Sequence, residues 1–294
     1  MSEQKSTIVR TGSTTGFAWL RGVALAAAER EAPRLGARLA VRMWMTIPPA
    51  AKVALGEPKT VLTDGGNRFV ASAWGEGPVV YLLHGWGGHR GQFGAFVQPL
   101  VASGFRVVAV DALGHGESGP GRYGRGRGLM PDFIAALEAA VRRFGPPHGV
   151  IAHSLGASAA AVATLDGFPS GRLVLIAPMS SPLPALDIFA KWLGIGPRVR
   201  AEMPRRIERI SRIPMARLDI VARAAECEEL PPALVIHDTG DRTVPFDSGV
   251  LVTAAWPGAR LERTQGLGHL RILADPSVVA QAVGFIAAVP AVTP

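Results

Sequence analysis

The sequence contains one serine in a position suited to a nucleophile. Ser154 lies in the run Ala-His-Ser-Leu-Gly at 152–156, where an apolar segment gives way to a stretch of small residues at 157–164. These two segments are typical of a buried strand and of a helix. A tight turn between strand and helix projects its central side chain out of the sheet, and small residues on both sides let the backbones approach closely. The pattern therefore predicts a nucleophile elbow centred on Ser154.

A serine hydroxyl is a poor nucleophile at neutral pH and needs a base. Among the seven histidines, His269 is best placed, because it ends the run Gly-Leu-Gly-His that follows the last expected strand, 260–264. Reactive groups in a parallel sheet gather beyond the carboxyl ends of its strands. The flanking glycines also suit a histidine that must reach the serine. We therefore expect His269 to be the base.

The base needs an acid that accepts its second N–H, fixes the useful tautomer and stabilises the imidazolium. Two aspartates, Asp238 and Asp241, follow the strand expected at 233–237. We favour Asp241, because the run Asp-Arg-Thr-Val-Pro places it deeper in the turn. Asp238 stays as the rival acid.

Backbone N–H groups must stabilise the negative charge of a tetrahedral intermediate. Leu155 offers one at the start of the expected helix, where the helix dipole also favours negative charge. The second should come from the glycine-rich run His-Gly-Trp-Gly-Gly at 84–88, which follows the first buried strand. We expect Trp86 to supply it, with Gly87 as the alternative.

These residues need a sheet whose strand ends meet at one edge. Apolar runs alternate with helical segments, which predicts a mostly parallel sheet with helices on both faces. We expect a catalytic domain over 60–294, with a helical cap inserted at about 178–232, where the alternation stops. The expected strands are 61–63, 69–74, 78–84, 105–110, 150–152, 172–177, 233–237 and 260–264, and the expected helices are 93–102, 129–144, 157–164 and 277–288.

Residues 1–59 form an extension outside this pattern, with a polar tail at 1–16 and helical composition over 17–45. Four arginines recur there at four-residue spacing and share one helix face, namely Arg30, Arg34, Arg38 and Arg42. A basic amphipathic helix can lie on an anionic membrane surface. We prefer a helix packed on the protein with solvated arginines, and keep a peripheral membrane contact as the alternative.

The composition excludes several classes of function. The net charge is +8, but arginine supplies nearly all of the positive charge, so we interpret it as compositional bias and expect no nucleic-acid partner. The chain has one cysteine, no Cys/His set with zinc spacing and no phosphate-binding loop, so we expect no metal and no cofactor. No apolar run is long enough to span a membrane and no clear signal peptide appears, so we expect a cytoplasmic protein. The sequence does not indicate the oligomeric state.

The motifs together resemble those of the α/β-hydrolase superfamily, from residue 60 to the C-terminus. By that resemblance Ser154, Asp241 and His269 are the catalytic triad, and Trp86 and Leu155 form the oxyanion hole. Small carboxylesterases of the pimeloyl carrier-protein methyl ester type are similar in their His-Gly-Trp-Gly turn and Ser-Leu-Gly elbow. The sequence departs from the common Gly-x-Ser-x-Gly pattern at its first position, where it has alanine. The motifs that carry the resemblance are His-Gly-Trp-Gly at 84–87, Asp-Ala-Leu-Gly-His-Gly-Glu-Ser at 111–118, the elbow at 152–156, Gly-Asp-Arg-Thr-Val-Pro at 240–245 and Gly-His at 268–269.

We therefore predict a serine hydrolase that cleaves small carboxylic esters through an acyl-enzyme. The apolar cap favours short-to-medium acyl chains. The alternatives keep the triad but act on thioesters, carrier-protein esters or C–C bonds. A non-catalytic binding protein is disfavoured, because such proteins usually lack a triad member. The residues expected to line the substrate pocket are His153, Leu186, Phe189 and Trp192.

Overall fold

The computed structural model describes residues 25–49 and 59–288 of the chain. The polar tail expected at 1–16 therefore lies outside the described residues. The chain divides into two compact units. One contains residues 45–185 and 211–294, and is called here the sheet unit. The other contains the residues up to Trp44 together with 186–210, and is called here the cap unit.

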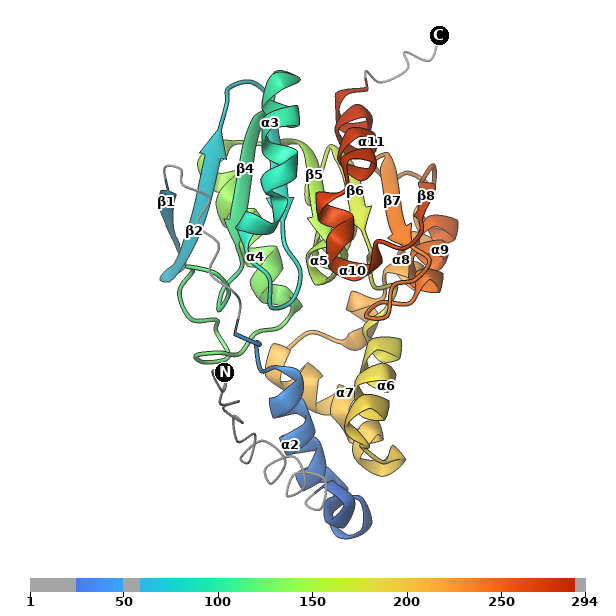
Figure 1. Ribbon diagram of the computed structural model, residues 1–294. Helices are drawn as coiled ribbons and strands as arrows, with labels where there is room; N and C mark the ends of the chain where they lie inside the picture. Colours follow the sequence, from blue (N-terminus) through green and yellow to red (C-terminus); the bar gives the residue numbers. More distant parts are fainter. Residues whose placement is uncertain (1–24, 50–58, 289–294) are drawn as a thin grey trace, which may run out of the picture. The chain divides into compact units, whose positions relative to one another are not determined.

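An eight-stranded sheet forms the centre of the sheet unit, in the order β1-β2-β4-β3-β5-β6-β7-β8 (Figure 1). β1 and β2 form the expected hairpin, and β2 also pairs antiparallel with β4. All other neighbours are parallel, which confirms the predicted fold class. The strands are β1 (Lys59–Asp64), β2 (Asn67–Trp74), β3 (Val79–Leu83), β4 (Arg106–Asp111), β5 (Pro147–His153), β6 (Arg172–Ile176), β7 (Ala233–Asp238) and β8 (Arg260–Thr264).

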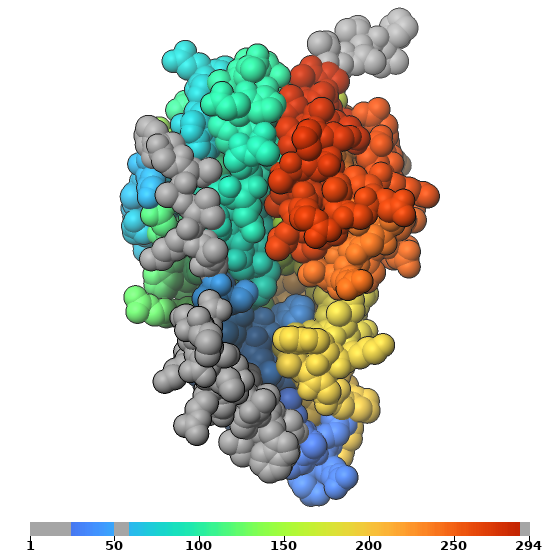
Figure 2. All heavy atoms as spheres, in the orientation of Figure 1, coloured from blue at the N-terminus to red at the C-terminus, as the bar shows by residue number. Residues whose placement is uncertain are grey.

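Helices cover both faces of this sheet (Figure 1). On one face, α3 (Gly94–Ala102) and α11 (Pro276–Ala287) lie side by side, as Figure 2 shows. The opposite face is covered by α4 (Met130–Phe144) and α5 (Leu155–Leu165), together with α8 (Ile220–Ala224) and α9 (Phe246–Ala255). Every residue of β3 and of β7 is buried, as a parallel strand between two helical layers requires.

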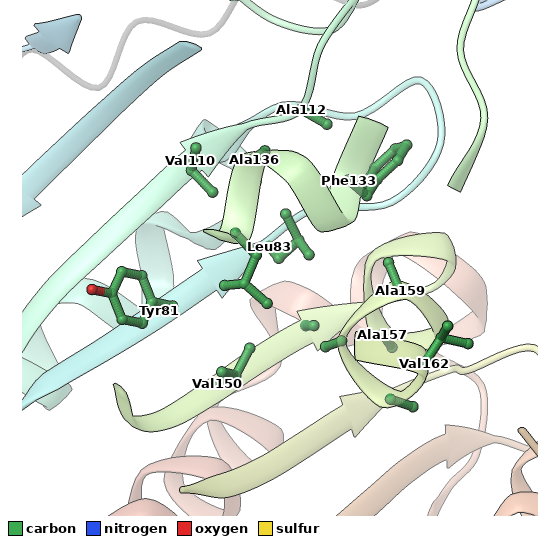
Figure 3. Close-up of a cluster of buried hydrophobic side chains, with 14 of the residues drawn as sticks. Tyr81, Leu83, Val110, Ala112, Phe133, Ala136, Val150, Ala157, Ala159 and Val162 are labelled. Carbon is green, nitrogen blue, oxygen red and sulfur yellow. The ribbon is translucent and has the colours of Figure 1, made fainter. Parts of the chain in front are cut away.

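The core between the sheet and α4 and α5 holds the nucleophile region in place. Figure 3 shows Leu83 of β3 and Val150 of β5 beside Ala136 of α4 and Ala157 of α5. The buried residues of α5 run from Gly156 to Thr164, and most of them are alanines. Small side chains bring the helix axis close to the strands, so α5 begins directly at the end of β5.

A buried ion pair connects the loops that follow β3 and β4. Arg90, in the short helix η1 (Arg90–Phe93), donates from its backbone N–H to Asp111 Oδ1 over 2.7 Å, and its guanidinium contacts the same carboxylate. Asp111 Oδ2 also accepts from the backbone N–H of Glu117 over 2.9 Å. Both charged side chains are almost fully buried, at 5% and 0% exposure. Asp111 therefore shapes the turn that carries Glu117.

The cap unit contains α2 (Pro33–Trp44) and most of α6 (Pro182–Leu193) and α7 (Pro197–Ser211). Gly36 of α2 packs so closely on α7 that a Cβ there would lie 2.6 Å from Val199. The carboxylate of Glu29 accepts from the backbone N–H groups of Arg198 and Val199, at 2.7 and 2.9 Å, and so caps the first turn of α7. Residues 25–44 of the extension and residues 186–210 of the expected insertion thus form one unit.

Only residues 186–210 of the insertion expected over 178–232 belong to the cap unit. The residues after 210 belong to the sheet unit, because η2 (Met215–Leu218) and α8 bury Leu218, Ile220 and Ala224 in its core. Residues 211–232 thus return the chain to the sheet unit before β7 begins.

The arginine stripe of the extension lies partly on α2. This helix buries Gly36, Ala37, Ala40 and Val41, while its arginines are exposed, as in the packed-helix interpretation. Within the described ranges, no single helix is long and apolar enough to cross a membrane. Gly268–Ala274 and Pro276–Ala287 meet the criteria of length and composition only as a pair bent by 65°.

Replacement of Gly156 by alanine should destabilise the sheet unit. An added Cβ would lie 2.2 Å from the carbonyl oxygen of His84 and 2.6 Å from that of Leu83, so helix and strand must separate. We expect a loss of about 1–3 kcal/mol in the free energy of unfolding, measured with urea. The control is Gly284→Ala in α11, where no atom lies within 4 Å and alanine should stabilise by about 0.5–1 kcal/mol. Equal stability of the two variants would contradict this account of the packing.

Candidate active site

Ser154 occupies a strained turn between β5 and α5. Its φ of 53° and ψ of −123° lie outside the regions that non-glycine residues normally adopt. Such a conformation costs about 1–3 kcal/mol and persists only where the surroundings enforce it. The Ser154 N–H donates to the carbonyl oxygen of Ile176 over 2.8 Å, which extends the pairing of β5 with β6 into the turn. The hydroxyl is thereby held at the carboxyl end of the sheet.

His269 and Asp241 complete a hydrogen-bonded series with this serine. His269 Nε2 is 3.0 Å from Ser154 Oγ, and His269 Nδ1 is 2.7 Å from Asp241 Oδ2. The three residues follow β8, β7 and β5, whose parallel pairing through β6 brings their carboxyl ends to one edge. With the Nδ1 proton directed to the carboxylate, Nε2 is free to accept the serine proton. The sequence had placed these three residues together, and the structure brings them within hydrogen-bond distance.

Asp241 is held in an ionised form. Its Oδ1 accepts from the backbone N–H groups of Thr243 and Val244, at 2.8 and 3.0 Å. Burial alone would raise the pKa of this carboxyl, but hydrogen bonds from His237 and His269 outweigh burial and hold the pKa well below its usual range. A carboxylate that stays charged can stabilise an imidazolium on His269.

Asp238, the rival acid, binds the loops around the site. Its Oδ1 accepts from the Gly240 N–H over 2.9 Å. Its Oδ2 accepts from the Thr264 hydroxyl and from the Leu267 N–H, both over 2.9 Å. Asp238 therefore connects the turn that carries Asp241 with the loop that carries His269.

The loop after β3 lies directly against the nucleophile. A Cβ on Gly85 would lie 2.8 Å from Ser154 Cβ, so only glycine permits this approach. Within the described part of the chain, the backbone N–H groups of Trp86 and Leu155 have no acceptor, which leaves both available for a ligand oxygen. The Trp86 ring packs against His115 and Phe133, at centroid distances of 5.2 and 6.5 Å. This packing fixes the turn that presents the Trp86 N–H.

The four residues expected in the substrate pocket belong to two different units. His153 is only 1% exposed, and its ring packs on His269 with centroids 4.6 Å apart. The other three belong to the cap unit. Leu186 is buried there, Phe189 packs edge-to-face on Trp44, and Trp192 is 78% exposed. Their part in a pocket stays a prediction.

Sequence reasoning assigned no role to His237, which contacts the acid. This residue is fully buried near the end of β7, with Nε2 3.1 Å from the Val244 carbonyl oxygen and 3.5 Å from Asp241 Oδ2. Its position four residues before Asp241, at the end of an apolar strand, was the available signal.

Among the described residues, no group of three or more His, Cys, Asp or Glu side chains could hold a metal ion.

Two buried histidines make folding sensitive to acid. Burial lowers the pKa of His84 and of His153 from 6.5 to about 3, with like-charge neighbours acting in the same direction. Both are therefore neutral in the folded protein but can take up protons when it unfolds. Because the folded pKa is the lower one, their contribution to stability is complete above about pH 6.5 and is lost as the pH falls towards 3.

We predict a weaker pH dependence of stability in a His84→Gln variant. Lowering the pH from about 7.5 to 5 should remove about 2 kcal/mol per buried histidine from the free energy of unfolding. Glutamine does not titrate, so the variant should lose about 2 kcal/mol less than the wild type over this interval. Urea unfolding at both pH values measures the difference. An identical loss in both proteins would show that His84 does not stay neutral on folding.

Known proteins resemble this chain in sequence. The sequence model of the family described as serine aminopeptidase, S33, matches residues 77–253. An uncharacterized protein of Mycobacterium tuberculosis is 26% identical over 272 residues, which cover 73% of this chain and 76% of that protein. A pimeloyl-[acyl-carrier protein] methyl ester esterase of Methylococcus capsulatus is 50% identical over 44 residues, or 15% of this chain and 17% of that protein.

Solved structures share the fold. An esterase from Exiguobacterium antarcticum superimposes with a TM-score of 0.60 at 16% identity, covering 79% of this chain and 100% of that one. The likeness extends over nearly the whole of that structure, so the sheet and its helices follow the α/β-hydrolase arrangement.

Proposed function

Because the chain belongs to the serine aminopeptidase S33 family of α/β-hydrolases, we propose that it cleaves carboxylic esters through an acyl-enzyme on Ser154. The observation that carries this proposal is the series from Ser154 Oγ through the His269 ring to Asp241, at 3.0 and 2.7 Å. A serine with a base and an oriented acid is the arrangement that activates an alcohol for attack on a carbonyl.

The reaction proceeds in two halves. Ser154 Oγ attacks the ester carbonyl while His269 Nε2 takes its proton, and the resulting oxyanion accepts hydrogen bonds from the N–H groups of Trp86 and Leu155. As the intermediate collapses, His269 gives that proton to the leaving alcohol. A water molecule then attacks the acyl-enzyme carbonyl and loses a proton to His269. His269 returns that proton to Ser154 Oγ as the bond to the acyl group breaks and the acid is released. Asp241 stays ionised throughout.

We propose that the enzyme prefers short-to-medium acyl chains, because residues 183–195 are mostly apolar.

Replacement of Ser154 by alanine should abolish turnover. Where a triad acts as a unit, loss of its nucleophile lowers kcat on the order of 10⁶-fold. The measurement is hydrolysis of p-nitrophenyl butyrate, with covalent labelling by a fluorophosphonate probe as the second readout. Ser277→Ala, which changes an exposed serine at the start of α11, is the matched control and should keep both. Undiminished hydrolysis or labelling in the Ser154 variant would refute the proposal.

A second candidate is an acyl group carried by an acidic protein. The segments 25–44 and 186–210 of the cap unit contain ten basic and five acidic side chains, a net charge of +5 in a chain whose total is +8. Burial lowers the pKa of Arg206, and the nearby Arg38 and Arg209 lower it further. Positive charge gathered on one unit speeds the encounter with an acidic partner. The name of the Methylococcus relative refers to such a carrier.

The same charge would attract an anionic lipid surface. However, α2 buries its small apolar face within the cap unit, so the described part of this helix offers lipid little beyond electrostatic attraction. We therefore propose a membrane contact only in this weaker, salt-sensitive form.

Charge reversal of Arg205 and Arg209 distinguishes the two candidate substrates, a carrier-bound ester and a small ester. Both side chains are exposed. For an acyl carrier-protein ester, R205E/R209E should lower kcat/KM about tenfold or more at low salt, and the difference should shrink as salt screens the charges. For p-nitrophenyl butyrate kcat/KM should not change. Equal kcat/KM of variant and wild type towards the carrier-bound ester would reject the carrier candidate.

A further inference from the structure

One buried histidine beside the triad has no part in the reaction described above. His153 precedes the nucleophile at the end of β5, and its Nε2 is 2.8 Å from the backbone carbonyl oxygen of His269. The two rings pack with centroids 4.6 Å apart. His153 therefore contacts the proposed base through both its backbone and its ring.

We propose that His153 is a positioning residue, whose Nε2–H donates to the His269 carbonyl and fixes the backbone from which the base projects. This inference rests on the proposed function, since it assigns the residue that holds the base of that reaction. In this role the His153 side chain stays neutral and exchanges no proton with the substrate.

The segment that carries His269 has little rigidity of its own. Gly266 and Gly268 adopt left-handed φ values of 80° and 65°, and an added Cβ on either would contact no atom within 4 Å. The helix that follows, α10 (Gly268–Arg271), is a single turn in which no residue is buried. The backbone of the segment is held by the N–H groups of Leu267 and Gly268, which bond Asp238, and by the His269 carbonyl, which contacts His153. Loss of one anchor should let the imidazole move relative to Ser154.

His153 shares a rigid strand end with the nucleophile. Its backbone pairs with Ile176 of β6, and the next N–H, that of Ser154, donates to the same residue. The path from Ser154 Oγ through the His269 ring and carbonyl returns through the His153 side chain to the serine backbone. This closed series of contacts fixes the distance between nucleophile and base.

Only one tautomer of His153 fits this role. Burial and the neighbouring His269 lower its pKa to about 3, so the ring carries a single N–H near neutral pH. With that proton on Nε2, Nδ1 is unprotonated, and within the described residues it has no hydrogen-bond partner. Nδ1 faces Gly85, where an added Cβ would lie only 3.2 Å away. A neutral ring also avoids repelling the imidazolium that forms on His269.

Two substitutions of His153 separate its hydrogen bond from its volume. Glutamine can place a donor close to the position of Nε2, whereas leucine fills space without a donor. On p-nitrophenyl butyrate, His153→Leu should lower kcat about 10- to 100-fold with KM nearly unchanged, because a misplaced base slows chemistry more than binding. His153→Gln should keep kcat within about threefold of the wild type and leave the pH profile of kcat/KM in place.

The matched control is His148→Leu. His148 lies on the same strand and also binds a backbone carbonyl, that of Ile286, over 3.0 Å, but on the far side of the sheet unit from the triad. The His148→Leu variant should be less stable than the wild type and should keep its kcat.

Hydrogen exchange gives a readout independent of turnover. The amides of Leu270 and Ile272 should exchange faster in His153→Leu than in the wild type, but not in His148→Leu.

The outcomes distinguish this inference from the proposed function. If His153→Leu keeps the wild-type kcat and exchange rates while Ser154→Ala is inactive, the positioning role is rejected and the function stands. If His153→Gln loses as much kcat as His153→Leu, or shifts the pH profile, the ring itself is required and the inference fails. If the wild type hydrolyses no ester, the function fails, and the exchange measurement still tests the contact.

Discussion

The left-handed backbone of Ser154 is the constraint on which the sheet unit depends. Its conformation is unfavourable for any residue with a side chain, so it must be enforced from outside. The carbonyl of Ile176 holds its N–H, while Gly85 and Gly156 let the loop after β3 and the start of α5 approach without a Cβ between them. Local strain, strand pairing and close packing are therefore parts of one arrangement that aims a hydroxyl at the edge of the sheet.

Parallel pairing then decides which other residues can meet that hydroxyl. The loops after β7 and β8 reach the same edge as the end of β5, and Asp238 fastens the two loops to each other. The acid and the base come from different loops, so their 2.7 Å contact requires both loops to be held. Asp238 and His237 at the end of β7, with His153 at the end of β5, hold them through buried hydrogen bonds. These three buried polar side chains lie beside the triad because both loops must be held in place.

The sequence was sufficient for the fold class and for the placement of Ser154, Asp241 and His269 near one another, because elbow, strand ends and glycine turns each have a local signal. For the contact of His237 with the acid it offered only a position near Asp241. It could not reveal that His153 contacts the base, since a histidine in an apolar run looks the same whatever it binds in space. Nor could it show that residues 25–44 and 186–210 form one unit. That contact joins Gly36 to Val199 across more than half of the chain, and its only local sign is a small residue in a helix.

The cap unit is held together by contacts of its own. Glu29 caps α7, Gly36 packs on Val199, and Trp44 packs on Phe189, so the unit is held together without any residue of the triad. The hydrogen bonds that set the reaction are buried in the sheet unit, where substitution is costly. The proposed recognition of an acidic carrier and the proposed chemistry therefore rest on different units of the chain.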